Sequence, residues 1–278
     1  MNIFSYYILA DIKLYKSDLN YGKRMKLSLN NPKLLSDSIS VISELVNDAK
    51  FKLDTDKLEL IAMDPANVAM VSFQMFSSAF TEYKVEKSTE ISLNLDSLKQ
   101  ILRRAKPSDN LIIELDEEKN KLNIKIKGES TRSFSLGLID LGEKQHRVPK
   151  LSFPLNIHTS NYIFDEAIED MSIFADSVIF NVSKDKFIIE SEGRINNAKV
   201  EILNDGETKI QWIESGETQE KNAKSKYSIE YLKKISKGGK LADNILLEFG
   251  NDYPLKIEFK AKDKLDLVFI LAPRVSEE

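Results

Sequence analysis

The chain has 278 residues, 42% of them hydrophobic and 30% charged, so it is long and apolar enough for one large or two medium domains. Its 44 acidic and 40 basic side chains give a formal net charge of −4, which argues against a generic polyanion binder that works by bulk charge. The lack of cysteine excludes disulfide scaffolds and thiolate chemistry, and two histidines, His146 and His158, exclude a histidine-rich metal site.

The first 24 residues differ from the rest of the chain. They lack a basic leading segment, and Asp11 and Lys13 interrupt their apolar part, so we do not expect a signal peptide. Met25 then opens a strand-like MKLSL segment. We expect residues 1–24 to be an N-terminal extension outside the fold, with an extra edge strand at 3–14 as the alternative. No apolar run approaches the roughly 20 residues that cross a membrane, so we expect a cytoplasmic protein.

Residues 25–138 predict a first domain of short strands and two helices. The helix expected over 32–47 places Leu35, Ile39, Ile42 and Leu45 near one face, with Pro32 in the favoured first turn. In chain order we expect a strand at 26–29, that helix, strands at 50–53, 58–63 and 69–75, a helix at 95–105, and strands at 111–115, 121–127 and 133–138.

Residues 139–153 form a connecting loop, because they hold Gly142, Pro149 and polar residues without a hydrophobic period. Residues 154–278 predict a second domain, in which we assign Trp212 and its loop at 205–223 no role. The expected elements are a strand at 155–158, a helix at 161–175, strands at 179–182, 187–191 and 198–203, a helix at 229–236, and strands at 245–249, 255–259 and 265–271.

The two predicted domains are copies of one pattern. The segment Leu98–Ile101 recurs as Leu232–Ile235, 134 positions later, and Asp56–Leu58 recurs as Asp185–Phe187, 129 positions later. Several matches in the same order, between elements of the same type, indicate an internal duplication. We therefore expect an α+β fold made of two similar domains of antiparallel sheet with two helices each.

Each copy leaves an unpaired edge strand, at 131–138 in the first and 197–203 in the second. Such edges invite pairing with another chain, and head-to-tail pairing gives a ring when the rotation closes. The helix near the first edge is basic and the helix near the second is acidic. We hypothesise that Arg103, Arg104 or Arg132 of one subunit faces Glu166 or Asp170 of the next; the alternative is two solvated helix faces.

Five stretches in order along the chain carry a family resemblance. They are LIAMDPANVA at 60–69, TRSF at 131–134, the pair Val148-Pro149, LEFGNDYPL at 247–255 and LAPRV at 271–275. In these stretches the chain resembles sliding clamps of the proliferating cell nuclear antigen family, of archaeal type, from Met25 to its end. The resemblance implies the DNA clamp fold and a processivity factor without catalytic activity. It implies a toroid, here most simply a homotrimer, with sheets outside and helices lining a hole for duplex DNA.

The resemblance also implies two sets of site residues. The cations expected to face DNA are Lys99, Arg103, Arg104, Lys233, Lys234, Lys237 and Lys240. A pocket for a short peptide with one aliphatic and two aromatic anchors would be walled by Met63, Val68, Met70, Val148, Pro149, Pro254, Ile270, Leu271, Ala272 and Pro273. DNA polymerase, the clamp loader and other replication and repair proteins would bind through this pocket. Because the four helices together are near neutral, we expect weak, salt-sensitive contacts with DNA.

The sequence contains few features that would indicate an enzyme. It contains no GxxxxGK[ST], GxGxxG, GxSxG or HExxH motif, and we expect no metal or cofactor. Glu166 and Asp170 lie at helical spacing, which leaves an acidic-site hydrolase as a remote alternative to a solvated surface. Within the resembled family, the alternative to a homotrimer is one subunit of a heterotrimeric or checkpoint-type clamp.

Overall fold

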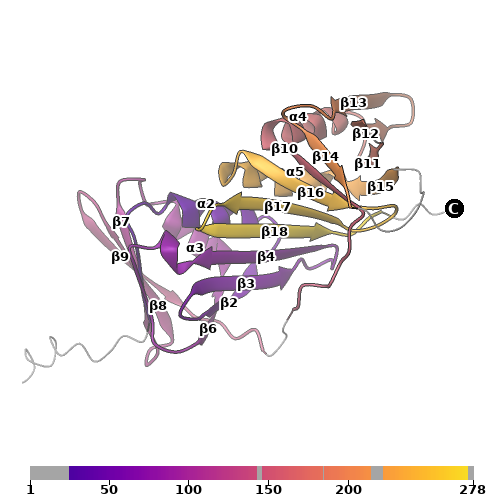
Figure 1. Ribbon diagram of the computed structural model, residues 1–278. Helices are drawn as coiled ribbons and strands as arrows, with labels where there is room; N and C mark the ends of the chain where they lie inside the picture. The colour runs from indigo at the N-terminus through magenta and orange to yellow at the C-terminus, as the bar shows by residue number, and fades with distance from the viewer. Residues whose placement is uncertain (1–24, 143–145, 184, 214–221, 275–278) are drawn as a thin grey trace, which may run out of the picture.

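The computed structural model describes residues 25–142, 146–183, 185–213 and 222–274, and the extension predicted at 1–24 lies outside them (Figure 1). Within these ranges the chain forms strands β1 to β18 and helices α2 to α5. No helix of the described part is long and apolar enough to span a bilayer. The fold is α+β with antiparallel sheets, as predicted.

The first copy runs through two sheets and two helices. Its elements are β1 (Met25–Leu29), α2 (Lys33–Ile42), β2 (Asp48–Leu53), β3 (Lys57–Met63), β4 (Ala69–Phe76), the 3₁₀ turn η1 (Ser77–Ala79), β5 (Glu82–Val85), β6 (Thr89–Asn94), α3 (Leu95–Leu102), β7 (Asn110–Asp116), β8 (Lys121–Lys127) and β9 (Thr131–Gly137). Strands β5 and β6 were not predicted, because they are short and rich in polar residues.

The second copy repeats this order. Its elements are β10 (Leu155–Ser160), α4 (Asn161–Met171), β11 (Ser177–Val182), β12 (Lys186–Glu192), β13 (Asn197–Leu203), β14 (Lys209–Trp212), β15 (Ala223–Ser228), α5 (Ile229–Ser236), the 3₁₀ turn η2 (Lys237–Lys240), β16 (Asn244–Phe249), β17 (Leu255–Ala261) and β18 (Leu265–Leu271). The loop predicted at 205–223 is wrong in part, since Trp212 ends strand β14 and pairs with Leu155.

Three of the predicted helices are shorter than expected. Helix α2 ends at Ile42 rather than at residue 47, because the amides of Glu44 and Leu45 bond three residues back, to Val41 and Ile42, which tightens the last turn. The tightened turn still buries Leu45 in the core. The predicted apolar face of the helix is therefore correct, and only the predicted end of the helix is wrong. Helices α3 and α4 likewise end at Leu102 and Met171.

The strand orders of the two copies are the same. The first copy gives β5-β1-β7-β8-β9 and β4-β3-β2-β6, and the second gives β14-β10-β16-β17-β18 and β13-β12-β11-β15. Strand β18 of the second copy pairs antiparallel with β4 of the first, from Leu265 opposite Met75 to Leu271 opposite Ala69. This pairing joins the two copies in one nine-stranded sheet.

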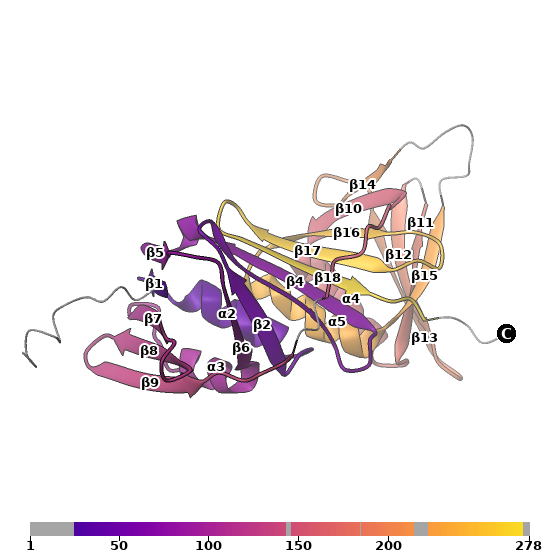
Figure 2. The same cartoon turned by 90° about the horizontal axis from the view of Figure 1, so that it is seen from below.

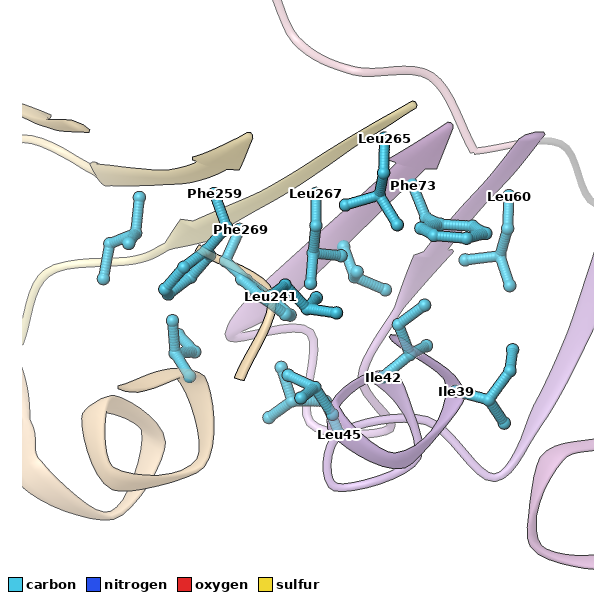
Figure 3. Close-up of a cluster of buried hydrophobic side chains, with 14 of the residues drawn as sticks. Ile39, Ile42, Leu45, Leu60, Phe73, Leu241, Phe259, Leu265, Leu267 and Phe269 are labelled. Carbon is cyan, nitrogen blue, oxygen red and sulfur yellow. The ribbon is translucent and has the colours of Figure 1, made fainter. Parts of the chain in front are cut away.

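The helices of both copies lie on one side of that sheet (Figures 1 and 2). Below the β4–β18 junction, Phe73, Leu267 and Phe269 point toward Ile42 of helix α2 and toward Leu241, which follows η2 (Figure 3). These side chains belong to one continuous buried cluster that crosses from copy to copy. Burial of this apolar surface fixes the two copies relative to each other.

The edges predicted at 131–138 and 197–203 are confirmed, since β9 ends the five-stranded sheet and β13 ends the four-stranded sheet. Strand β15 also ends the four-stranded sheet, but the amides of Arg274 and Asp252 bond its carbonyls at Lys226 and Lys224. The chain therefore covers β15 with its own backbone and leaves β9 and β13 without such cover in the described part.

The β4–β18 junction makes a first prediction. Phe73 is fully buried there, so Phe73→Ala removes most of its side-chain packing and is expected to lower the free energy of unfolding by about 3–5 kcal/mol. Ser72→Ala, on the half-exposed outer face of the same strand, is the matched control and is expected to change it by less than about 0.5 kcal/mol. Chemical denaturation measures both; equal losses would contradict the assignment of the core to the helix side.

Candidate functional site

The helix face carries all seven cations expected to meet DNA, on α3, α5 and the turns that follow them. At its centre, Glu44 accepts Lys237 Nζ at 2.8 Å and Lys99 Nζ at 3.5 Å. Glu44 belongs to the first copy and Lys237 to the second, so this group bridges the two copies. The hydrogen bond from Lys237 holds the pKa of Glu44 below its ordinary value, against a smaller opposing effect of burial.

Two more of these cations have acidic partners. Lys233 Nζ lies 2.6 Å from Glu169 Oε2, and Lys234 Nζ lies 2.6 Å from Glu230 Oε1. Arg103, Arg104 and Lys240 make no ion pair within the described part of the chain. A helix face with most of its cations neutralised in this way suits weak contacts with a phosphate backbone rather than tight binding.

Three residues predicted to wall a peptide pocket lie together on the face of the sheet opposite the helices. Met63, Met70 and Ile270 sit in one row across β3, β4 and β18, because Met63 pairs with Met70 and Met70 pairs with Ile270. Met70 and Ile270 are 7% and 8% exposed, while Met63 is half-buried. Methionine and isoleucine give an apolar surface that adapts to a partner.

The remaining predicted wall residues divide into two groups. Val68, Pro254, Ala272 and Pro273 are half-buried and Val148 and Pro149 are exposed, so all six can meet a partner. Leu271 cannot, because alternation along β18 turns its fully buried side chain into the core. Its place in the predicted wall is therefore wrong, and only its backbone helps to hold the wall in place.

Asp64, for which the sequence predicted no role, anchors one side of this wall. It is 4% exposed and opens the Asp64–Val68 turn between β3 and β4. Pro65 supplies the fixed φ that a turn favours, and Asn67 adopts the left-handed φ of 57° that asparagine tolerates. Asp64 Oδ1 accepts the amides of Val68 and Ala69, both at 2.7 Å, and Oδ2 accepts that of Ala66 at 3.1 Å.

Tyr231, on helix α5, completes the coordination of this carboxylate. Its hydroxyl donates to Asp64 Oδ2 at 2.6 Å, so a side chain of the second copy bonds the turn of the first. Burial pushes the pKa of Asp64 upward, but the amides and the hydroxyl outweigh it and hold the pKa below its ordinary value. The two residues are far apart in sequence, and no local pattern could have predicted their contact.

The residues predicted for subunit contacts differ in whether they have an acidic or basic partner within the described chain. Arg103, Arg104, Glu166 and Asp170 are exposed and have no ion pair within the described residues. Arg132 is different, because its guanidinium donates to Asp109 Oδ2 at 2.5 Å and to the carbonyl of Arg104 at 2.6 Å. Arg132 thus already has an acidic partner in its own chain, and its contact with an acid of a neighbouring subunit stays a prediction.

The sequence matches settle the family. Residues 25–145 match the N-terminal domain of proliferating cell nuclear antigen, and residues 147–274 match its C-terminal domain. The chain belongs to the proliferating cell nuclear antigen family. Among curated relatives, a DNA polymerase sliding clamp of Pyrococcus furiosus is 35% identical over 239 residues, 86% of this chain and 94% of that protein. One of Nanoarchaeum equitans is 34% identical over 252 residues, 90% of this chain and 99% of that protein.

Solved structures agree on the fold of this family member. A structure of PCNA from Thermococcus kodakaraensis superposes with a TM-score of 0.82 at 22% identity, over 90% of this chain and 100% of that one. A proliferating cellular nuclear antigen from Entamoeba histolytica gives 0.82 at 20% identity, over 90% and 99%. The predicted two-copy antiparallel architecture is thus shown by geometry as well as by sequence.

Glu44 makes a second prediction. Its carboxylate is about a quarter exposed, so Glu44→Gln is expected to cost up to about 1 kcal/mol of unfolding free energy at pH 7. A lowered pKa stabilises the fold above the ordinary value of 4.5, and this contribution disappears as the pH falls through the lowered value. The difference between variant and parent should therefore vanish in acid, as read by denaturation at several pH values. Glu166→Gln, at an exposed acid, is the control; a pH-independent cost at Glu44 would contradict the ion-pair explanation.

Proposed function

We propose that this chain is the subunit of a DNA polymerase sliding clamp, in which three copies close head-to-tail around duplex DNA. The proposal of a ring rests on one observation, that the two free edge strands are equivalent to the two strands that pair inside the chain. In the shared topology β9 takes the place of β18, and β13 takes the place of β4. Within the chain β18 pairs with β4, so β9 of one subunit can pair in the same way with β13 of the next subunit.

The internal junction also supplies a register for the junction between subunits. Aligning β8–β9 with β17–β18, and β3–β4 with β12–β13, sets Phe134 opposite Ala198 and Arg132 opposite Val200 of the next copy. All four side chains are half-buried in the single chain, as expected of residues that a neighbouring subunit would bury further. The pairing would extend the sheet from subunit to subunit.

The ends of the helices support the same contact. By the internal repeat, Arg103 stands where Lys237 does, and the exposed Asp170 stands where helix α2 has Val41, which is 1% exposed. Ile173 and Ile195, which are 68% and 95% exposed, lie near the free β13 edge. A neighbour seated there would cover apolar surface and bring Arg103 to an acidic helix.

In such a ring the helix layer faces the hole, and DNA is held by enclosure. The neutralised cations allow transient phosphate contacts, and tight ones would hinder sliding. We assign the chain no catalytic step. Polymerase, clamp loader and other clients are proposed to bind at the Met63–Met70–Ile270 row and the linker, and we place this work in the cytoplasm. The alternative, one subunit of a mixed clamp, is not favoured, since the curated relatives are named simply as DNA polymerase sliding clamps.

The function is tested with a polymerase extending a primer on circular DNA, with and without this chain and a clamp loader. We expect longer products only when both are present. Linearising the DNA should remove the effect, because a ring slides off a free end. Unchanged product length on the circle would refute the clamp.

The subunit contact makes a third prediction. Arg103→Glu puts an acid beside Asp170 of the next copy, and exposed pairs are worth up to about 1 kcal/mol, so the trimer should dissociate at up to about tenfold higher concentration at low salt. Light scattering after size exclusion measures it. Arg103→Glu with Asp170→Lys should restore the parent value, and Lys121→Glu, an exposed site on β8, should not change it. A single copy at every concentration in the parent would instead support the mixed clamp.

The pocket makes a fourth prediction. Ile270→Ala shortens the side chain at the β18 end of the row and is expected to weaken binding of a labelled peptide with one aliphatic and two aromatic anchors by about tenfold, a cost of roughly 1.4 kcal/mol. Pro149→Ser should weaken it as well. Val268→Ala, on the same outer face two residues earlier, is the control. Fluorescence anisotropy measures the affinity, and parent-like binding by Ile270→Ala would exclude the row as the anchor site.

A further inference from the structure

The turn that walls the proposed pocket is held by a closed circuit of hydrogen bonds. Asp64 fixes the amides of Val68 and Ala69, and the Val68 carbonyl accepts the Ala272 amide at 2.9 Å. Two residues further on, the Arg274 amide donates to the Lys226 carbonyl of β15 at 2.7 Å. Strand β15 leads directly into helix α5, whose Tyr231 returns to Asp64. Every segment on this side of the pocket is thus bonded to the next.

Tyr231 is the one side-chain link in that circuit between the two copies. Its ring is half-buried, and Lys234 Nζ lies 5.4 Å from the ring centroid. Burial, followed by the bond to the Asp64 carboxylate, raises the pKa of Tyr231 to about 12, so the hydroxyl keeps its proton at neutral pH. At neutral pH the Tyr231 hydroxyl therefore remains a donor to the charged carboxylate of Asp64.

The internal repeat shows that the fold itself does not require this contact. By the offsets of the duplication, Gly193 stands in place of Asp64, and Ser97 stands in place of Tyr231. Gly193 has no side chain, and Ser97 lies in the first turn of its own helix, where its amide and hydroxyl both donate to Oδ1 of the N-cap residue Asn94 at 2.9 Å. The junction beside the pocket has the Asp–Tyr contact, and its structural counterpart at the free edges does not.

We propose that Tyr231 and Asp64 are positioning residues for peptide binding, forming a latch in which the hydroxyl of the second copy holds the Asp64–Val68 turn in the shape that receives a client's apolar anchors. The inference rests on the proposed pocket. It adds that the affinity of the pocket depends on a residue that does not line it and that lies on the helix layer of the sheet. Loss of the hydroxyl leaves Asp64 Oδ2 with the Ala66 amide alone and loosens the turn, while the three amide bonds keep the turn formed.

The test uses the full chain with Tyr231→Phe, which removes the hydroxyl and keeps the ring. We expect the labelled peptide with one aliphatic and two aromatic anchors to bind about three- to tenfold more weakly, well below the unfolding temperature. Hydrogen exchange at the amides of Val68 and Ala69 should quicken, while exchange in the middle of β3 stays as in the parent. Tyr162→Phe, at a tyrosine that is 70% exposed on α4, is the matched control and should change neither reading.

The outcomes separate the latch from the pocket. Parent-like affinity in Tyr231→Phe overturns the positioning role, and so does unchanged exchange at Val68 and Ala69. A loss of affinity that only follows a lowered unfolding midpoint, with faster exchange spread evenly over β3 and β4, overturns it too. If the parent itself does not bind the peptide, the proposed pocket fails, and the exchange measurement still decides whether Tyr231 holds the turn.

Discussion

The pairing of β18 with β4 is the interaction on which the rest of the molecule depends. It consumes one edge strand from each copy of the duplicated unit and makes a single nine-stranded sheet out of two open ones. Because the two copies share one topology, the same pairing necessarily leaves the equivalent strands, β9 and β13, without a partner inside the described part of the chain. In the proposed assembly these two uncovered edges are where neighbouring copies would pair.

The same junction decides where the two functional faces lie. It sets the helices of both copies side by side on one side of the sheet (Figure 2). Lys99 of the first copy and Lys237 of the second therefore both reach Glu44. On the other face it brings Ile270 beside Met70 and Met63. A proposed DNA surface and a proposed client pocket therefore lie back to back on one sheet, with the core between them.

Much of this architecture could be predicted from the sequence, because alternation and helical spacing are local signals. The strands 121–127 and 265–271 and the helix 229–236 match the structure end to end. Local signals failed where the pattern was weak: β6 and β14 carry few apolar residues, and α2 stops early where its amides switch to tighter bonds. Of the candidate site, only the residues that lie in recognisable motifs could be predicted. Leu271 was misplaced because a continuous run was assigned to the wall, although alternation along the strand puts Leu271 and Ile270 on opposite faces. Asp64 with Tyr231 was missed because their contact exists only after the two copies join.

The two kinds of junction differ in a way that fits their tasks in the proposed ring. At the internal one, fully buried Leu267 packs near Phe73 and Phe269, and burial of this kind stabilises the contact between the two copies (Figure 3). At the external one the equivalent residue is Arg132, whose charge is neutralised by Asp109 of its own chain, in a corner where a Cβ on Gly128 would collide with that carboxylate. In the proposed ring Arg132, which is already paired with Asp109 of its own chain, would stand at this position instead of a leucine. The contact between subunits would therefore bury less apolar surface there than the internal contact does. In the proposed ring the external junction would thus be weaker than the internal one, so the ring could open to admit a duplex while each subunit stays whole.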